Sequence, residues 1–203
     1  MSKSSVGVGV IGVGFVGGQA HAPAFRKILK SRLVGLADIV EAKVKPLAEK
    51  YGVRYYLDYM ELLKNPEVDA VVVANPTPFH YKTAKAAIEK GKHVMCEMPV
   101  APTVEEIKDL GKSAEKAGVL LMPDLNFRFT PNYVKAKELI GSGAIGDPVA
   151  VSFREFIPAK DQAAQWPAGS WAWDKKLSGG LPDYTLSVWS LDLLRWLFNA
   201  EFQ

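Results

Sequence analysis

The sequence VGVGVIGVGFVG, running from Val6 to Gly17, predicts a β-strand that turns directly into a helix. It begins as a buried β-strand would, because small residues alternate with β-branched ones as far as Ile11. It continues as Gly-x-Gly-x-x-Gly, in which the first glycine permits a tight turn, the second lets a diphosphate approach the backbone and the third lets the next helix pack closely. The free N–H groups at the start of that helix form an anion site. The motif therefore predicts a dinucleotide-binding unit that contacts its cofactor through Gly12, Gly14, Phe15, Val16 and Gly17.

A second predicted strand, Arg32–Asp38, ends in the carboxylate of Asp38, which lies 21 positions after Gly17. An acid at about 20 residues beyond the glycines accepts hydrogen bonds from the adenosine ribose hydroxyls, and its charge repels a 2′-phosphate. The sequence thus predicts NAD rather than NADP, with Asp38 and the adjacent Ile39 in contact with it. As an alternative, Asp38 caps a helix that begins near Glu41, and one side chain can serve both roles.

The composition describes a globular chain of 203 residues, of which 48% are hydrophobic. The formal charge is +3 and the Lys and Arg residues are scattered, so the clustered basic face of a nucleic-acid binder is not expected. A single cysteine, Cys96, excludes an internal disulfide framework. The chain begins without an apolar secretion signal and contains no apolar run of about 18 residues. We therefore expect a cytoplasmic protein that binds neither nucleic acid nor membrane.

Strand and helix patterns alternate up to about residue 120, which is typical of an α/β fold with a doubly wound parallel sheet. The predicted strands after Asp38 are Val53–Leu57, Val68–Ala74, His93–Cys96 and Val119–Met122. The predicted helices cover residues 15–30, 41–51, 58–64, 80–90 and 103–117. Thr103 and Glu106 have the spacing of a capping box at the start of the last helix. In the first helix we expect Pro23 to loosen a turn and the buried side to carry Ala20, Ala24, Phe25, Ile28 and Leu29.

Two predicted loops stand at the carboxyl ends of strands, where open α/β sheets bind their ligands. Asn75-Pro76-Thr77-Pro78 follows the strand Val68–Ala74, and the two prolines require extended backbone. Glu97-Met98-Pro99 follows the strand His93–Cys96 in the same way.

The pattern changes after Pro123, so we expect a dinucleotide-binding domain over residues 1–123 and the start of a second, α+β domain over residues 124–203. The second part is expected to contain a helix over residues 131–140, a strand at Val149–Ile157, a loop over residues 158–182 and an apolar helix over residues 183–198.

Segments spread over nearly the whole chain resemble the Gfo/Idh/MocA family of NAD(P)-dependent oxidoreductases. They are Gly12–Gly17 with Asp38, Asn75–His80, Gly91–Pro99, Asn126–Phe129 with Ile140–Gly146, and Gly179–Gly180 with Leu191–Leu197. The resemblance implies a Rossmann domain followed by an α+β domain whose open sheet covers the active site and mediates oligomerisation. It further implies that Glu97 lies beside the nicotinamide ribose and that Arg128 lines the site. The remaining predicted cofactor contacts are therefore Asn75, Pro76, His80, Glu97, Met98 and Arg128.

Two positions depart from the family pattern. Met98 stands where the Glu-Lys-Pro motif has the lysine that assists deprotonation of the substrate hydroxyl. Trp189 stands at the position of the usual histidine, and Thr185 at that of the preceding aspartate. Since transfer of a hydride from an alcohol requires a proton acceptor near the substrate oxygen, another group has to take this role. The candidates are Lys175, Lys176, Asp183, Tyr184 and His80, of which we favour Lys176, Asp183 and Tyr184.

Three functions are compatible with these residues. The first is an oxidoreductase that transfers a hydride between nicotinamide and a sugar, polyol or related hydroxy compound. The second is a catalytically impaired NAD-binding sensor or partner subunit. The third is a glycosidase-like enzyme that uses NAD in an internal redox cycle.

Several single residues have more than one interpretation. His80 either faces the cofactor cleft or caps its helix, whereas His21 and His93 are expected to be structural. No His, Cys and Glu set has metal-ligand spacing, so no metal is expected. Cys96 is expected to be a buried strand residue rather than a nucleophile.

The predicted helix over residues 183–198 carries apolar side chains on more than one side, so it requires cover. Members of the family that the chain resembles commonly continue for more than a hundred residues beyond this point. The chain is therefore expected to be a fragment, to have an unusually small second domain, or to associate, with a homo-oligomer as our prediction.

Overall fold

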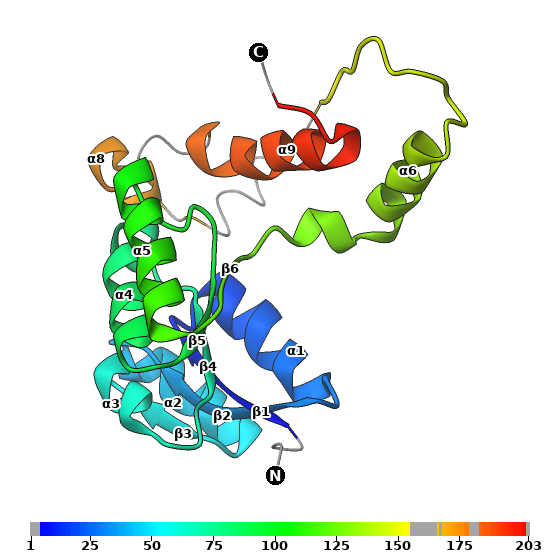
Figure 1. The fold of residues 1–203 in the computed structure, drawn as a ribbon. Helices are drawn as coiled ribbons and strands as arrows, with labels where there is room; N and C mark the ends of the chain where they lie inside the picture. The colour runs from blue at the N-terminus through cyan, green and yellow to red at the C-terminus, as the bar shows by residue number, and fades with distance from the viewer. Residues whose placement is uncertain (1–4, 155–165, 167, 179–182, 202–203) are drawn as a thin grey trace. The chain divides into compact units, whose positions relative to one another are not determined.

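The computed structural model describes residues 5–154, 166, 168–178 and 183–201, and it divides into two compact units (Figure 1). The first unit is Met1–Asp124 and the second is Leu125–Gln203. Among the described helices, none has the length and apolar character needed to cross a membrane.

The first unit is built on a parallel sheet of six strands in the order β3-β2-β1-β4-β5-β6. The strands are β1 (Val6–Ile11), β2 (Ser31–Ala37), β3 (Arg54–Tyr56), β4 (Ala70–Val73), β5 (His93–Cys96) and β6 (Leu121–Pro123). The strand order reverses between β1 and β4, which pair with each other from Val8↔Ala70 to Ile11↔Val73. This is the doubly wound Rossmann arrangement predicted from the sequence, and sheets of this kind bind their ligands at that reversal, at the carboxyl ends of the strands.

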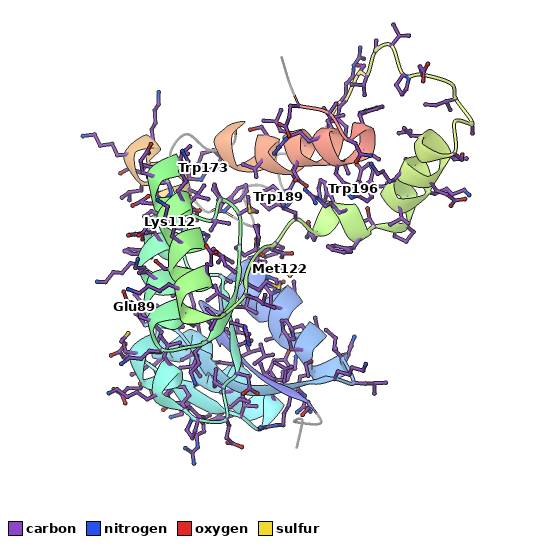
Figure 2. All side chains as sticks on the ribbon, viewed as in Figure 1. Glu89, Lys112, Met122, Trp173, Trp189 and Trp196 are labelled. Atoms are coloured by element: carbon purple, nitrogen blue, oxygen red, sulfur yellow. The ribbon has the colours of Figure 1, made fainter. Side chains whose placement is uncertain are left out.

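Helices cover both faces of the sheet and form two buried cores. One core includes residues of α3 (Tyr59–Lys64), α4 (His80–Glu89) and α5 (Val104–Ala117), and the other includes residues of α1 (Ala22–Lys27) and α2 (Glu41–Tyr51). Figure 1 shows α4 and α5 side by side on one side of the sheet and α1 on the other. The exposed faces of α4 and α5 carry charged side chains such as Glu89 and Lys112 (Figure 2). The apolar strand sequences are thus explained, because the central strands are covered on both faces.

The capping box predicted at α5 is confirmed. The Thr103 hydroxyl accepts a hydrogen bond from the Glu106 backbone N–H at 3.2 Å, and the Glu106 carboxylate accepts one from the Thr103 N–H at 3.2 Å. Gly118 ends the helix with φ +66°, a left-handed conformation that glycine adopts without steric cost. Local sequence therefore determines both ends of this helix.

The prediction for the helix after the glycine motif is only partly right. Its first part, η1 (Gly17–His21), is a π-helix, so the turn before Pro23 is loosened as expected. The predicted apolar side is right for Phe25, which packs against the core. It is wrong for the other four residues, because the helix ends at Lys27 and the exposed residues are Ala20, Ala24, Ile28 and Leu29, the last 97% exposed. The extra residue in the π turn shifts the spacing of side chains around the helix, and the buried positions become Gly17, Gly18, His21 and Ala22.

The second unit is helical in its described part. It contains η3 (Asn126–Phe129), α6 (Pro131–Gly141), η4 (Trp171–Trp173), α8 (Lys175–Ser178) and α9 (Asp183–Phe198). The helices over residues 131–140 and 183–198 are thus confirmed to within a residue. Two short helices, η4 and α8, occupy part of the region expected to be a loop.

The predicted strand Val149–Ile157 is wrong over residues 149–154, which have no regular secondary structure, and residues 155–157 lie outside the described part of the chain. A strand requires a neighbour for its backbone N–H and C=O groups, and the described residues of this unit contain no strand that pairs with it. Val149 is instead fully open to solvent.

Aromatic residues of α9 pack on the preceding helices of the second unit. Figure 2 shows Trp189 and Trp196 projecting from α9; the Trp189 ring lies 6.3 Å from that of Phe127, and the Lys137 ammonium lies 5.5 Å from the centre of the Trp196 ring. Lys137 Nζ also donates to the Leu197 carbonyl at 3.0 Å, so that one cation satisfies the carboxyl end of α9.

Candidate cofactor-binding site

The glycine motif forms a tight turn between β1 and η1. Gly12 has φ +88°, and a Cβ atom there would lie 2.4 Å from the Asn75 backbone nitrogen. A Cβ on Gly17 would lie 1.9 Å from the Gly12 carbonyl oxygen. By contrast, a Cβ on Gly14 would meet no described atom within 4 Å. The first and third glycines are therefore required by close packing, whereas the middle one borders open space, as the predicted approach of a diphosphate to the backbone requires.

Asp38 ties the end of β2 to the glycine turn. Its Oδ2 accepts a hydrogen bond from the Val13 N–H at 2.9 Å, and its Oδ1 accepts one from the Val40 N–H at 2.9 Å. The N-cap of α2 is Val40 and makes no side-chain cap, so the expectation that Asp38 caps this helix is wrong; the carboxylate closes a local turn instead. A carboxylate has about four acceptor sites, so two remain for the hydroxyls of a ribose. The neighbouring Ile39 is 87% exposed.

His80 joins the loops after β4 and β5. Its Nε2 lies 2.6 Å from the Asn75 carbonyl oxygen and its Nδ1 lies 2.6 Å from that of Pro99. The ring is buried, burial lowers its pKa, and the N-cap of α4 is Phe79. Neither reading from the sequence describes this position, because His80 neither caps the helix nor is open to a cleft. His80 thus links the loops that follow β4 and β5.

Asn75 carries a buried polar atom without a partner in the described structure. Its Nδ2 donates to the Thr83 hydroxyl at 2.9 Å, whereas its Oδ1 is buried and accepts no hydrogen bond. Such an atom is costly unless a ligand or solvent satisfies it. The open space at Gly14, the spare acceptor sites of Asp38 and this unsatisfied oxygen are the features that a dinucleotide would use.

Three titratable side chains meet beside the ends of β5 and β6. His21 Nε2 lies 2.6 Å from Glu97 Oε1 and 3.6 Å from Asp124 Oδ2. The side chains are 9%, 14% and 11% exposed, respectively. Their donor atoms lie within 4.8 Å of one another, a grouping that can also surround a metal ion. Ligand spacing in the sequence does not predict this set, because its members come from three separate elements.

Burial is the main cause of an unusual pKa in this cluster. Burial and the negative charge of Glu97 raise the pKa of Asp124, His21 opposes the increase, and the resulting pKa is about 6. Cys96, immediately before Glu97, is fully buried and burial raises the pKa of its thiol, so it is an inert strand residue as expected.

The other predicted site residues have varied surroundings. Met98 packs against the core beside β5. In the second unit, Arg128 is held by Asp192, with a 2.7 Å hydrogen bond from Nε to Oδ2 and a second from Nη2 to Oδ1. Lys176 is exposed on α8, while the side chains of Asp183 and Tyr184 lie outside the described residues. That Lys176, Asp183 or Tyr184 accepts the substrate proton therefore stays a prediction.

The fold and the glycine turn define an NAD(P)-binding Rossmann protein. The family model of oxidoreductases with an NAD-binding Rossmann fold matches residues 6–125, and that of the GFO/IDH/MocA C-terminal domain matches residues 133–203. The chain belongs to the GFO/IDH/MocA family of oxidoreductases, as the motifs predicted.

Related proteins span both polyol and sugar dehydrogenases. Myo-inositol 2-dehydrogenase of Thermotoga maritima is 34% identical over 197 residues, covering 97% of this chain and 56% of that protein. D-glucoside 3-dehydrogenase of Escherichia coli is 30% identical over 193 residues, covering 95% and 54%. The structure of GenD2 from gentamicin A biosynthesis in complex with NAD has a TM-score of 0.83 and 28% identity, covering 97% of this chain and 54% of that one. The chain thus spans about half the length of these relatives.

Proposed function

We propose that this chain is the cofactor-binding part of an NAD-dependent oxidoreductase acting on a CH–OH group of a sugar or polyol. The observation that carries the proposal is the glycine turn with Asp38 beside it, which offers bare amides to a diphosphate and a carboxylate to a ribose. The named activities of the relatives support the substrate class. Bound NAD would supply the hydride acceptor, and unit 1 would orient it through Gly12–Gly17, Asp38 and Asn75.

The preference for NAD over NADP rests on the charge of Asp38. A 2′-phosphate placed at the end of β2 would meet the carboxylate that already accepts hydrogen bonds from Val13 and Val40. The two negative charges would repel each other, which disfavours the binding of NADP. A homo-oligomeric assembly, a cytoplasmic location and a domain boundary at residues 123 and 124 stay predictions; the last is supported by the two compact units.

The proposal is tested by calorimetric titration of the chain with NAD+ and NADP+, followed by nicotinamide absorbance measurements with a panel of inositols, hexoses and glucosides. We expect NAD+ to bind about tenfold more tightly than NADP+ or better. Asp38→Asn should bring the ratio of the two dissociation constants, for NADP+ and NAD+, closer to one. Asp58→Asn, which alters only the N-cap of α3, should leave this ratio unchanged. Equal affinities for the two dinucleotides would refute the cofactor assignment, and binding without reduction by any substrate would refute the activity. The sensor and glycosidase alternatives find no support among the relatives described above.

A further inference from the structure

We propose that His21, Glu97 and Asp124 form a proton-exchanging cluster that responds to the charge of the nicotinamide ring, and that it holds more protons with NADH bound than with NAD+ bound. The inference rests on the proposed function, because it assumes that the crevice of unit 1 takes a nicotinamide dinucleotide. It adds to that function a role for three residues that no sequence motif connects.

The cluster lies in the half of the crevice that the adenosine does not use. Asp38 and the glycine turn place the adenosine and diphosphate at the ends of β2 and β1, so the other half of a dinucleotide extends toward β4, β5 and β6. Glu97 follows β5, and its N–H donates to the Val73 carbonyl at 2.9 Å. Asp124 follows β6, and its N–H donates to the Cys96 carbonyl at 2.9 Å. Both carboxyl groups therefore stand on the nicotinamide side.

The cluster contains two carboxyl groups and one imidazole, so its charge changes when a single proton is added. Each proton that the cluster gains makes its net charge one unit more positive. The pKa of Asp124, raised to about 6 mainly by burial, places this change within the range in which enzymes operate. His80 and Cys96 are the other titratable groups of the described residues whose pKa responds to Glu97. His80 is held by two backbone carbonyls, and burial keeps the Cys96 thiol protonated.

The direction of the coupling follows from charge. The ring of NAD+ is positive and stabilises the negative form of the cluster, whereas the neutral ring of NADH does not. In the proposed reaction the substrate C–H bond gives a hydride to the cofactor, the O–H bond gives up a proton, and a cluster carboxylate gains one proton. The cluster thus holds a proton in the half of the crevice where the family lysine is replaced by Met98.

Binding of the two cofactors to the 203-residue chain tests this inference without a substrate. The dissociation constants of NAD+ and NADH are measured by calorimetry from about pH 5 to about pH 8, with a chelator present to exclude metal ions. We expect the ratio Kd(NADH)/Kd(NAD+) to rise about 3- to 10-fold with increasing pH. Asp124→Asn should flatten this rise. Asp109→Asn, which removes a carboxylate between α4 and α5 that binds Lys85, should follow the wild type.

A second variant guards against misfolding of the first. His21→Gln keeps a hydrogen-bond donor near Glu97 but removes the charge that lowers the Asp124 pKa, so the midpoint of the rise should move to higher pH. A flat ratio in the wild type, a rise unchanged in Asp124→Asn, or a midpoint unmoved in His21→Gln would overturn the inference while leaving the proposed function intact. A pH dependence seen only without the chelator would assign the cluster to a metal ion and overturn it too. Failure of both cofactors to bind would overturn the inference and the proposed function together.

Discussion

At the scale of single residues, glycines that share one motif have different physical roles. The Cβ of any larger residue at position 17 would collide with the Gly12 carbonyl, but position 14 has open space around it. Stability and cofactor binding therefore depend on different members of the motif, and substitutions to alanine can separate the two.

We expect Gly17→Ala to lower the free energy of unfolding by about 2–4 kcal/mol, because the methyl group displaces backbone rather than a flexible side chain. Gly14→Ala should change it by less than about 0.5 kcal/mol. It should nevertheless weaken NAD+ binding about tenfold or more, since the methyl group projects into the space proposed for the diphosphate. Urea denaturation and calorimetric titration of both variants measure these effects. Equal losses of stability in the two variants would contradict the assignment.

Asp124 is expected to make stability depend on pH. Its pKa is higher in the folded protein than in the unfolded chain, so between about pH 4 and pH 6 the folded state binds more protons, and ionisation at higher pH costs stability. Asp124→Asn removes that cost. The free energy of unfolding of Asp124→Asn minus that of the wild type should therefore be about 1–2 kcal/mol larger at pH 7 than at pH 4. This range is reduced because solvent partly screens the carboxyl group. Denaturation at the two pH values measures this difference, and a difference independent of pH would show that Asp124 ionises normally.

At the scale of elements, local sequence explains α5 more completely than α1. The capping box at Thr103 and the left-handed Gly118 define the ends of α5, and its sequence contains no conflicting signal. In α1, Pro23 follows a π turn, and the pattern of buried residues is decided by packing against the sheet.

Thr103→Ala should lower the free energy of unfolding by about 1 kcal/mol, because the N–H of Glu106 loses its acceptor. Glu106→Gln should have a much smaller effect, since glutamine also fits the capping box. Thermal denaturation followed by circular dichroism compares the two. Equal losses of stability in the two variants would show that the charge of Glu106 matters as much as the hydroxyl of Thr103, contrary to this prediction.

At the scale of the whole molecule, the chain divides into two compact units. The residues proposed to hold the cofactor in unit 1 are Gly12–Gly17, Asp38, Asn75 and Glu97, and their observed hydrogen bonds stay within that unit. We therefore expect a fragment of residues 1–124 to unfold cooperatively and to bind NAD+ with a Kd within about tenfold of that of the whole chain. Calorimetry on the fragment and on the chain gives the comparison. Loss of binding by a fragment that is still folded would show that unit 2 supplies an essential contact, with Arg128 the first residue to test.

The sequence by itself determined the parallel Rossmann sheet, the glycine turn and the position of Asp38. These features depend on short-range patterns: alternating apolar residues, glycines at fixed spacing and turn residues between elements. It also identified the family, because several such motifs occur in order. The strand predicted at Val149–Ile157 was not supported over its described part, because a strand depends on a partner that local sequence does not specify.

Only the tertiary structure decided what His80 and His21 do. His80 bonds to carbonyls five and nineteen residues away, and His21 meets Glu97 and Asp124, which follow two different strands. Parallel strands separated by helices bring their carboxyl ends to one edge of the sheet, so residues far apart in the chain become neighbours there. The desolvation that raises the pKa of Asp124 arises from the same packing and has no local sequence signal.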